Sequence, residues 1–123
     1  MKTINPSELS PMQVQMILQT AVSPRPIALA STIDKNGNVN LSPFSFFNLF
    51  SSNPPILIFS PARRVRDNST KDTLHNVLEV PEVVIGNVNF DMVQQVSLSS
   101  TEYETGVDEF IKSGLTKNPS DLV

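Results

Sequence analysis

The chain has no cysteine, a single histidine and only four glycines among its 123 residues. The absence of cysteine excludes disulfides, thiolate nucleophiles, iron–sulfur clusters and zinc sites built on cysteine. With His75 alone, a multi-histidine metal site is excluded as well. The glycines form neither G-x-G-x-x-G nor G-x-x-x-x-G-K-[ST], which disfavours Rossmann and P-loop nucleotide binding. No nucleophile elbow is present either. From these absences together we expect no metal site and no catalytic side chain.

Excess positive charge and long apolar runs are missing too. The formal net charge of −3 argues against nucleic acid or an anionic membrane surface as the main partner. No apolar stretch approaches the length that spans a bilayer, and the polar residues 1–6 do not resemble a signal peptide. We therefore expect a cytoplasmic protein with no nucleic-acid partner and no membrane partner.

The length and composition are those of one packed domain, covering residues 1–123. Hydrophobic residues make up 39% of the chain and charged residues 17%, as in ordinary globular proteins. A chain of this length removes roughly 65% of its unfolded surface from water. Neither a disulfide nor a metal is needed to stabilise such a core.

The first half of the sequence indicates a helix followed by strands. Ser10, Pro11 and Gln13 resemble a capping box and predict a helix to about Thr20. Two strands, residues 27–33 and 38–42, are joined by a turn that contains Asn36-Gly37. Pro43 is expected to interrupt the pairing, and residues 56–59, apolar on both faces, to form a central strand covered on each side.

The second half predicts shorter elements. Residues 72–78 have the periodicity of an amphipathic helix, residues 83–88 that of a fourth strand, and residues 90–96 that of another helix. From Ser99 onward the segment is mostly polar and is interpreted as an active-site or interface segment more than core. Early hairpin pairing indicates a small antiparallel sheet or barrel with peripheral helices, and fits a doubly wound sheet poorly.

Hydroxyl and basic residues gather before the helix expected at residues 72–78. Arg63, Arg64, Arg66 and Lys71 are four of the nine cations and lie within nine positions. Together with serine and threonine hydroxyls and the free N–H groups of the helix start, they can hold a phosphate. The alternative is a solvated loop, which is the usual role of such arginines.

Small polar and aromatic residues alternate over residues 40–48. Such a strand can line a flat ligand, with rings for stacking and amides for hydrogen bonds to its edge. The alternative is ordinary strand alternation, with phenylalanine inward and serine outward. His75 is interpreted as structural or on the surface, and the carboxylates Glu102, Glu104, Asp108 and Glu109 as a solvated face without a catalytic role.

Taken together, these motifs resemble the flavin reductase-like, FMN-binding split-barrel proteins, including flavoredoxin-type members. The resemblance runs from about Val22 to the end of the chain. The segments that carry it, in order, are residues 24–29, 38–48, 52–55, 71–73 and 106–110.

The resemblance implies a mainly β fold with short helices, a split β-barrel that binds FMN, usually as a homodimer. It also implies electron transfer from NADH or NADPH through FMN to free flavin, an acceptor protein or a metal. By position, the cofactor-binding residues are those along the ring and ribityl chain, Asn40, Ser42, Pro43, Phe44 and Ser45, and those at the phosphate, Ser60, Arg64, Lys71 and Thr73.

One departure from the family pattern concerns length. Family members are usually longer, and their later strands complete the barrel, so we expect this chain to lack the C-terminal part. An open sheet exposes strand edges that favour pairing with another chain. Two alternatives to a reductase therefore stay open: a flavin-binding module without turnover, and a structural fragment that self-associates.

Overall fold

The computed structural model describes residues 3–64 and 67–122. The predicted cation Arg66 lies outside the described residues. In chain order the elements are η1 (Pro6–Glu8), α1 (Pro11–Ala21), β1 (Ala28–Ile33), β2 (Val39–Phe44), β3 (Phe47–Ser52), β4 (Pro55–Phe59), α2 (Asp72–Glu79), β5 (Val84–Asn87), η2 (Phe90–Met92), α3 (Val93–Ser99) and α4 (Glu109–Ser113).

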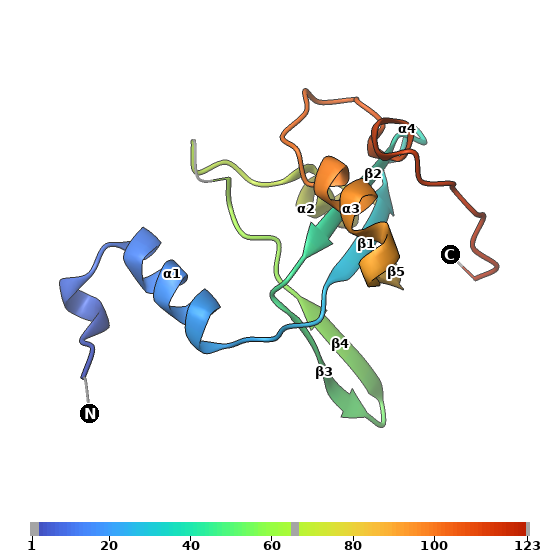
Figure 1. Cartoon of the computed structure of the whole chain (residues 1–123). Helices are drawn as coiled ribbons and strands as arrows, with labels where there is room; N and C mark the ends of the chain where they lie inside the picture. Colours follow the sequence, from blue (N-terminus) through green and yellow to red (C-terminus); the bar gives the residue numbers. More distant parts are fainter. Residues whose placement is uncertain (1–2, 65–66, 123) are drawn as a thin grey trace.

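Two separate antiparallel sheets form the framework of the fold. β1 lies between β2 and β5 in a three-stranded sheet, and β3 pairs with β4 in a two-stranded hairpin. Helices α2, α3 and α4 gather around β1 and β2, whereas the β3–β4 hairpin and α1 extend away from them (Figure 1). Antiparallel sheets with short peripheral helices agree with the predicted fold class.

The sequence signals at α1 produce the predicted helix. The Ser10 hydroxyl accepts a hydrogen bond from the Gln13 N–H, the Gln13 side chain accepts one from the Ser10 N–H, and Pro11 occupies the first turn. Arg25 caps the other end by donating to the backbone oxygens of Gln19 and Val22. No residue of α1 is buried. No helix of the described part of the chain is long and apolar enough to cross a membrane.

The predicted β1–β2 hairpin is confirmed, and its turn is set by one aspartate and one glycine. The Asp34 carboxylate accepts hydrogen bonds of 2.8 Å from the N–H groups of Asn36 and Asn38. Gly37 adopts a φ of +87°, a conformation that suits glycine. The hairpin brings Ile33 opposite Val39 at the start of the pairing.

Pro43 does not interrupt the pairing, so this prediction is wrong. It lies within β2, opposite Leu29 of β1. β2 is an edge strand of its sheet, and an edge strand tolerates proline where the missing N–H would have faced outward.

Residues 56–59 form a strand as predicted, but the prediction that this strand is central and covered is wrong. β4 pairs only with β3 among the described strands. The side chains of Ile56, Leu57 and Ile58 are 40%, 51% and 48% exposed. The sequence therefore encodes an apolar hairpin whose faces the rest of the described chain leaves open.

The hydrophobic core lies between the three-stranded sheet and the C-terminal helices. Leu29, Leu41 and Val96 are buried there. The partly buried residues that pack against them are Val88, Met92, Phe110 and Leu115. The last two come from α4 and the segment after it, which were not predicted to contribute to the core.

Candidate functional site

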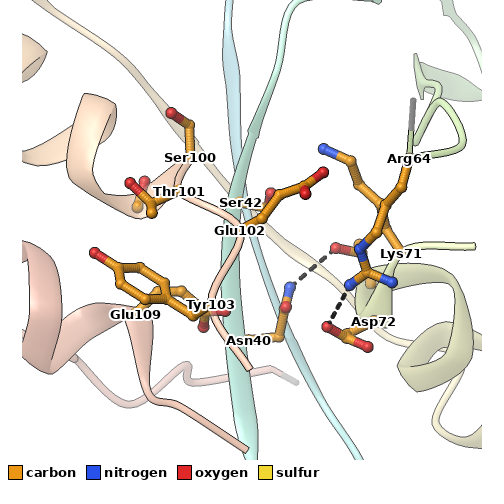
Figure 2. Close-up of a pocket in the computed structure, with 12 residues that line it drawn as sticks. Asn40, Ser42, Arg64, Lys71, Asp72, Ser100, Thr101, Glu102, Tyr103 and Glu109 are labelled. Atoms are coloured by element: carbon orange, nitrogen blue, oxygen red, sulfur yellow. Dashed lines mark hydrogen bonds and ion pairs between the residues drawn. The ribbon is translucent and has the colours of Figure 1, made fainter. Parts of the chain in front are cut away.

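A polar cleft lies between the start of α2, the strand β2 and the segment that joins α3 to α4 (Figure 2). Its enclosed space measures about 40 Å³, room for about three water molecules. The cleft can thus enclose a small group such as a phosphate, while a planar ring system would have to lie outside it. The residues that line it are Asn40, Ser42, Arg64, Lys71, Asp72, Thr73, Ser99, Ser100, Thr101, Glu102, Tyr103 and Glu109.

Arg64 is fixed on one side of the cleft by neighbours from its own loop and from α2. Its Nη2 donates a hydrogen bond of 2.8 Å to Asp72 Oδ2, which is also an ion pair, and its Nη1 donates one of 2.7 Å to the Thr70 oxygen. The guanidinium is only partly exposed. These contacts orient the positive charge before any ligand arrives.

Lys71 is the second cation of the cleft and stands at the N-cap of α2. The helix start has no side-chain cap, so its first N–H groups are available to a ligand. The ammonium lies 5.3 Å from the centre of the Phe44 ring. Burial, followed by the charge of Arg64, lowers the pKa of Lys71, while the Glu102 carboxylate acts in the opposite direction. An anion in the cleft would relieve the repulsion between the two cations.

Thr73 and Asn40 form the floor of the site and are both buried. Asn40 Nδ2 donates a hydrogen bond of 2.9 Å to Thr73 Oγ1, drawn as a dashed line in Figure 2. Because Thr73 Oγ1 is the acceptor, its own proton is free to face the cleft. The contact also fixes α2 against β2.

The opposite wall carries hydroxyls and carboxylates. Glu109 Oε2 accepts a hydrogen bond of 3.1 Å from the Leu41 N–H, and burial raises the pKa of Glu109. The Ser99 hydroxyl donates to the Val96 oxygen and the Ser100 hydroxyl to the Ser97 oxygen. In the described part of the chain, no group of three or more histidine, cysteine, aspartate or glutamate side chains could hold a metal ion.

Five of the nine predicted cofactor-binding residues meet in this cleft: Asn40, Ser42, Arg64, Lys71 and Thr73. Strand alternation explains why Asn40 and Ser42 share one face of β2. The predicted convergence of the anion-binding cluster is thus seen for Arg64, Lys71 and Thr73.

The other four predicted residues do not line the cleft. Phe44 is buried, and its ring centre lies 5.1 Å from that of Phe59. The Phe44 ring also contacts the Lys71 ammonium through a cation–π interaction. Pro43 follows Ser42 and so faces the other side of β2. Ser45 lies after the strand, and the Ser60 N–H is paired with the Phe46 oxygen. Their contacts with a cofactor stay a prediction.

Sequence reasoning missed Asp72 on the α2 side and the whole far wall, which consists of residues 99–103 and Glu109. The sequence pattern predicts a solvated face for Glu102 and Glu109, although it also indicates an active-site or interface segment from Ser99 onward. A local signal for α4 was available. Asp108 caps its start by accepting from the N–H groups of Phe110 and Ile111, and Gly114 ends it with a φ of +71°.

No protein-family model matches the chain. Among curated proteins, an uncharacterized protein of Aquifex aeolicus is 42% identical over 102 residues, which is 83% of this chain and 52% of that protein. An uncharacterized protein of Halalkalibacterium halodurans is 38% identical over 120 residues, 98% of this chain and 57% of that protein. The chain therefore spans about half the length of the curated relatives it matches.

Solved structures share the fold. Nitrilotriacetate monooxygenase component B from Bacillus cereus superposes with a TM-score of 0.92 at 28% identity, over 100% of this chain and 60% of that one. The 2-nitrobenzoate 2-nitroreductase of Pseudomonas fluorescens gives a TM-score of 0.83 at 27% identity, over 99% of this chain and 57% of that one. A flavin reductase-like protein with a split barrel domain from Shewanella frigidimarina gives a TM-score of 0.74 at 25% identity, over 94% of this chain and 56% of that one.

These neighbours confirm the predicted fold class. The chain has the fold of flavin reductase-like split-barrel proteins, and the part it comprises corresponds to 56–60% of the solved chains compared above.

Proposed function

We propose that this chain binds FMN and belongs to a reductase that passes electrons from NADH or NADPH through FMN to an acceptor. The observation that carries the proposal is the convergence of Arg64, Lys71 and Thr73 at the uncapped start of α2. Helix N–H groups, two cations and a hydroxyl form a donor set that fits a phosphate dianion. Flavin reductase-like structural neighbours support the same cofactor class.

The carboxylates of the cleft must also be compatible with a bound phosphate. Asp72 is paired with Arg64, so its charge is already compensated. The Lys71 ammonium makes no ion pair with a described residue, and the Glu102 carboxylate extends toward it from the segment before α4 (Figure 2). We propose that Lys71 donates to the phosphate, that Arg64 offers N–H donors held in place by its pair with Asp72, and that Thr73 donates its free hydroxyl proton.

The ring system and ribityl chain are proposed to extend from the cleft along β2. Asn40 and Ser42 line the cleft and offer polar groups to the ribityl chain. The strand continues through Pro43 and Phe44 to Ser45, where backbone groups and side chains would meet the edge of the ring. When bound, FMN supplies the redox chemistry. The side chains of the protein bind and orient it, and none is assigned an acid or base role.

Homodimer formation is also proposed, since apolar side chains of the described β3–β4 hairpin are exposed. Leu49 and Phe50 of β3 are 61% and 64% exposed, and Leu57 of β4 is 51% exposed. A second copy of the chain could cover this hairpin and add to the flavin site. The electron acceptor is proposed to be free flavin or a partner protein.

The phosphate assignment is tested by comparing FMN with riboflavin, which lacks the phosphate. Lys71→Ala is expected to weaken FMN binding about 10- to 100-fold, the range for a hydrogen bond to a charged group, and to leave riboflavin binding unchanged. Lys112→Ala, which removes an exposed lysine of α4, serves as the charge-matched control and should change neither. Equal losses for both flavins in Lys71→Ala would refute the assignment.

The reductase part has a separate test. The flavin absorbance of the FMN-loaded protein should be bleached by NADH or NADPH without oxygen. Bound FMN that neither nucleotide reduces would favour a binding module without turnover. Concentration-dependent size with no flavin binding would favour a self-associating fragment.

A further inference from the structure

Glu109, the first residue of α4, reaches across the cleft to the backbone of β2. Its Oε2 accepts the Leu41 N–H at 3.1 Å, joining residues that are 68 positions apart in the chain. β2 pairs only with β1 among the described strands, so the N–H groups on its outer edge have no strand partner there. Glu109 supplies a side-chain partner for one of them.

This contact fixes the part of β2 that faces the cleft. Leu41 directs its own side chain into the core, where it is 2% exposed. Its neighbours Asn40 and Ser42 point the other way and line the cleft. Holding the Leu41 N–H therefore holds both of these side chains in position.

The charge of Glu109 is not compensated by an ion pair with any lysine or arginine of the described chain. Among the described residues, Arg64 pairs with Asp72 and Lys117 with Asp108, while no lysine or arginine pairs with Glu109. The other charged or titratable groups of the cleft are Lys71, Asp72 and Arg64 on the α2 side, and Glu102 and Tyr103 on the segment before α4.

Burial first, and then the charges of Asp72 and Asp108, raise the pKa of Glu109. Its carboxyl group is therefore protonated at a higher pH than an ordinary glutamate.

We infer that Glu109 is a positioning and specificity-determining residue: its hydrogen bond to Leu41 fixes the ligand-facing segment of β2, and its negative charge limits the affinity of the cleft for a phosphorylated ligand. This inference rests on the proposed phosphate site at Arg64 and Lys71. When Glu109 is protonated, the hydrogen bond persists because its carbonyl oxygen still accepts, but the repulsion disappears. The carboxyl group thus couples anion affinity to pH.

Two substitutions separate the two roles. Glu109→Gln removes the charge and keeps an acceptor for the Leu41 N–H, so FMN should bind about fivefold more tightly, the effect of one charge on a dianion in a partly solvated cleft. Riboflavin binding should not change. Glu109→Ala removes the acceptor as well, so Leu41 amide hydrogen exchange should accelerate and both flavins should bind more weakly. Glu104→Gln, an exposed carboxylate outside the cleft, is the matched control and should behave as the wild type.

The pH dependence gives a second readout. The FMN advantage of Glu109→Gln over the wild type should shrink as the pH falls through the raised pKa of Glu109, because the wild type then loses the same charge. Protonation of the FMN phosphate, whose second pKa is about 6, also weakens this repulsion, so the same comparison is made with inorganic sulfate, which stays a dianion over this range. An advantage that does not change with pH would overturn the proposed coupling.

Inorganic phosphate provides a readout that does not depend on flavin binding. It should raise the thermal unfolding temperature of Glu109→Gln more than that of the wild type. If the wild type binds no flavin but this difference is observed, the proposed function fails and the role of Glu109 stands. An unchanged FMN-to-riboflavin ratio in Glu109→Gln, or no phosphate effect in either protein, would overturn the charge role. Unchanged Leu41 exchange in Glu109→Ala would overturn the positioning role.

Discussion

Asn40 on β2 and Thr73 on α2 lie 33 positions apart in the sequence, and Asn40 Nδ2 donates a hydrogen bond of 2.9 Å to Thr73 Oγ1. The two residues are 8% and 1% exposed. This contact joins the strand and the helix that carry the two sides of the proposed flavin site. Its loss should affect both stability and ligand binding.

Thr73→Val keeps the shape of the side chain but leaves the buried Asn40 amide without its acceptor. The free energy of unfolding should fall by about 1–3 kcal/mol, the cost of an unsatisfied buried polar group, as measured by urea denaturation. Thr101→Val, at an exposed threonine of the same cleft, should change it by no more than about 0.5 kcal/mol. Similar losses in the two variants would show that the contact is not specific.

FMN affinity should fall at alkaline pH because of Lys71. Burial and the nearby Arg64 lower the pKa of this lysine, so its ammonium is lost at a lower pH than in an ordinary lysine, whose pKa is about 10.4. The ratio of FMN to riboflavin affinity should therefore begin to decrease while the pH is still below the range in which an ordinary lysine loses its proton. Lys71→Arg keeps its charge over this range and should show a nearly constant ratio. A decrease of the same size in Lys71→Arg would rule out Lys71 as the titrating group.

The β3–β4 hairpin should govern self-association. Leu49 and Leu57 face each other across the two strands and are 61% and 51% exposed. Leu57→Glu should lower the apparent mass in sedimentation experiments at high concentration, since a charge opposes burial in an interface. Ile111→Glu, at a residue of α4 that is 77% exposed, should leave the mass unchanged. A wild-type chain that stays monomeric at all concentrations would contradict the proposed homodimer.

Much of the fold could be predicted because its signals are local. Ser10 and Gln13 cap α1 as the sequence indicates, and the Asp34–Gly37 turn joins β1 to β2. The start of α2 near Lys71 was also predicted, and with it the cationic side of the cleft. These features depend on residues within a few positions of each other.

The remaining features depend on contacts between distant residues, which a local pattern does not specify. The Leu41–Glu109 hydrogen bond joins β2 to a helix of five residues, and nothing in the surrounding sequence indicates that Glu109 turns inward. Similarly, the apolar run in β4 predicts a strand but does not identify what covers it. Pro43 was misjudged because its effect depends on whether the strand lies at an edge.

The most direct test of the phosphate site is a crystal structure of the chain with FMN. The phosphate should lie within hydrogen-bonding distance of Lys71 Nζ and of the first N–H groups of α2, with the isoalloxazine ring outside the cleft along residues 42–47. FMN bound with its phosphate away from Arg64, Lys71 and Thr73 would contradict the account.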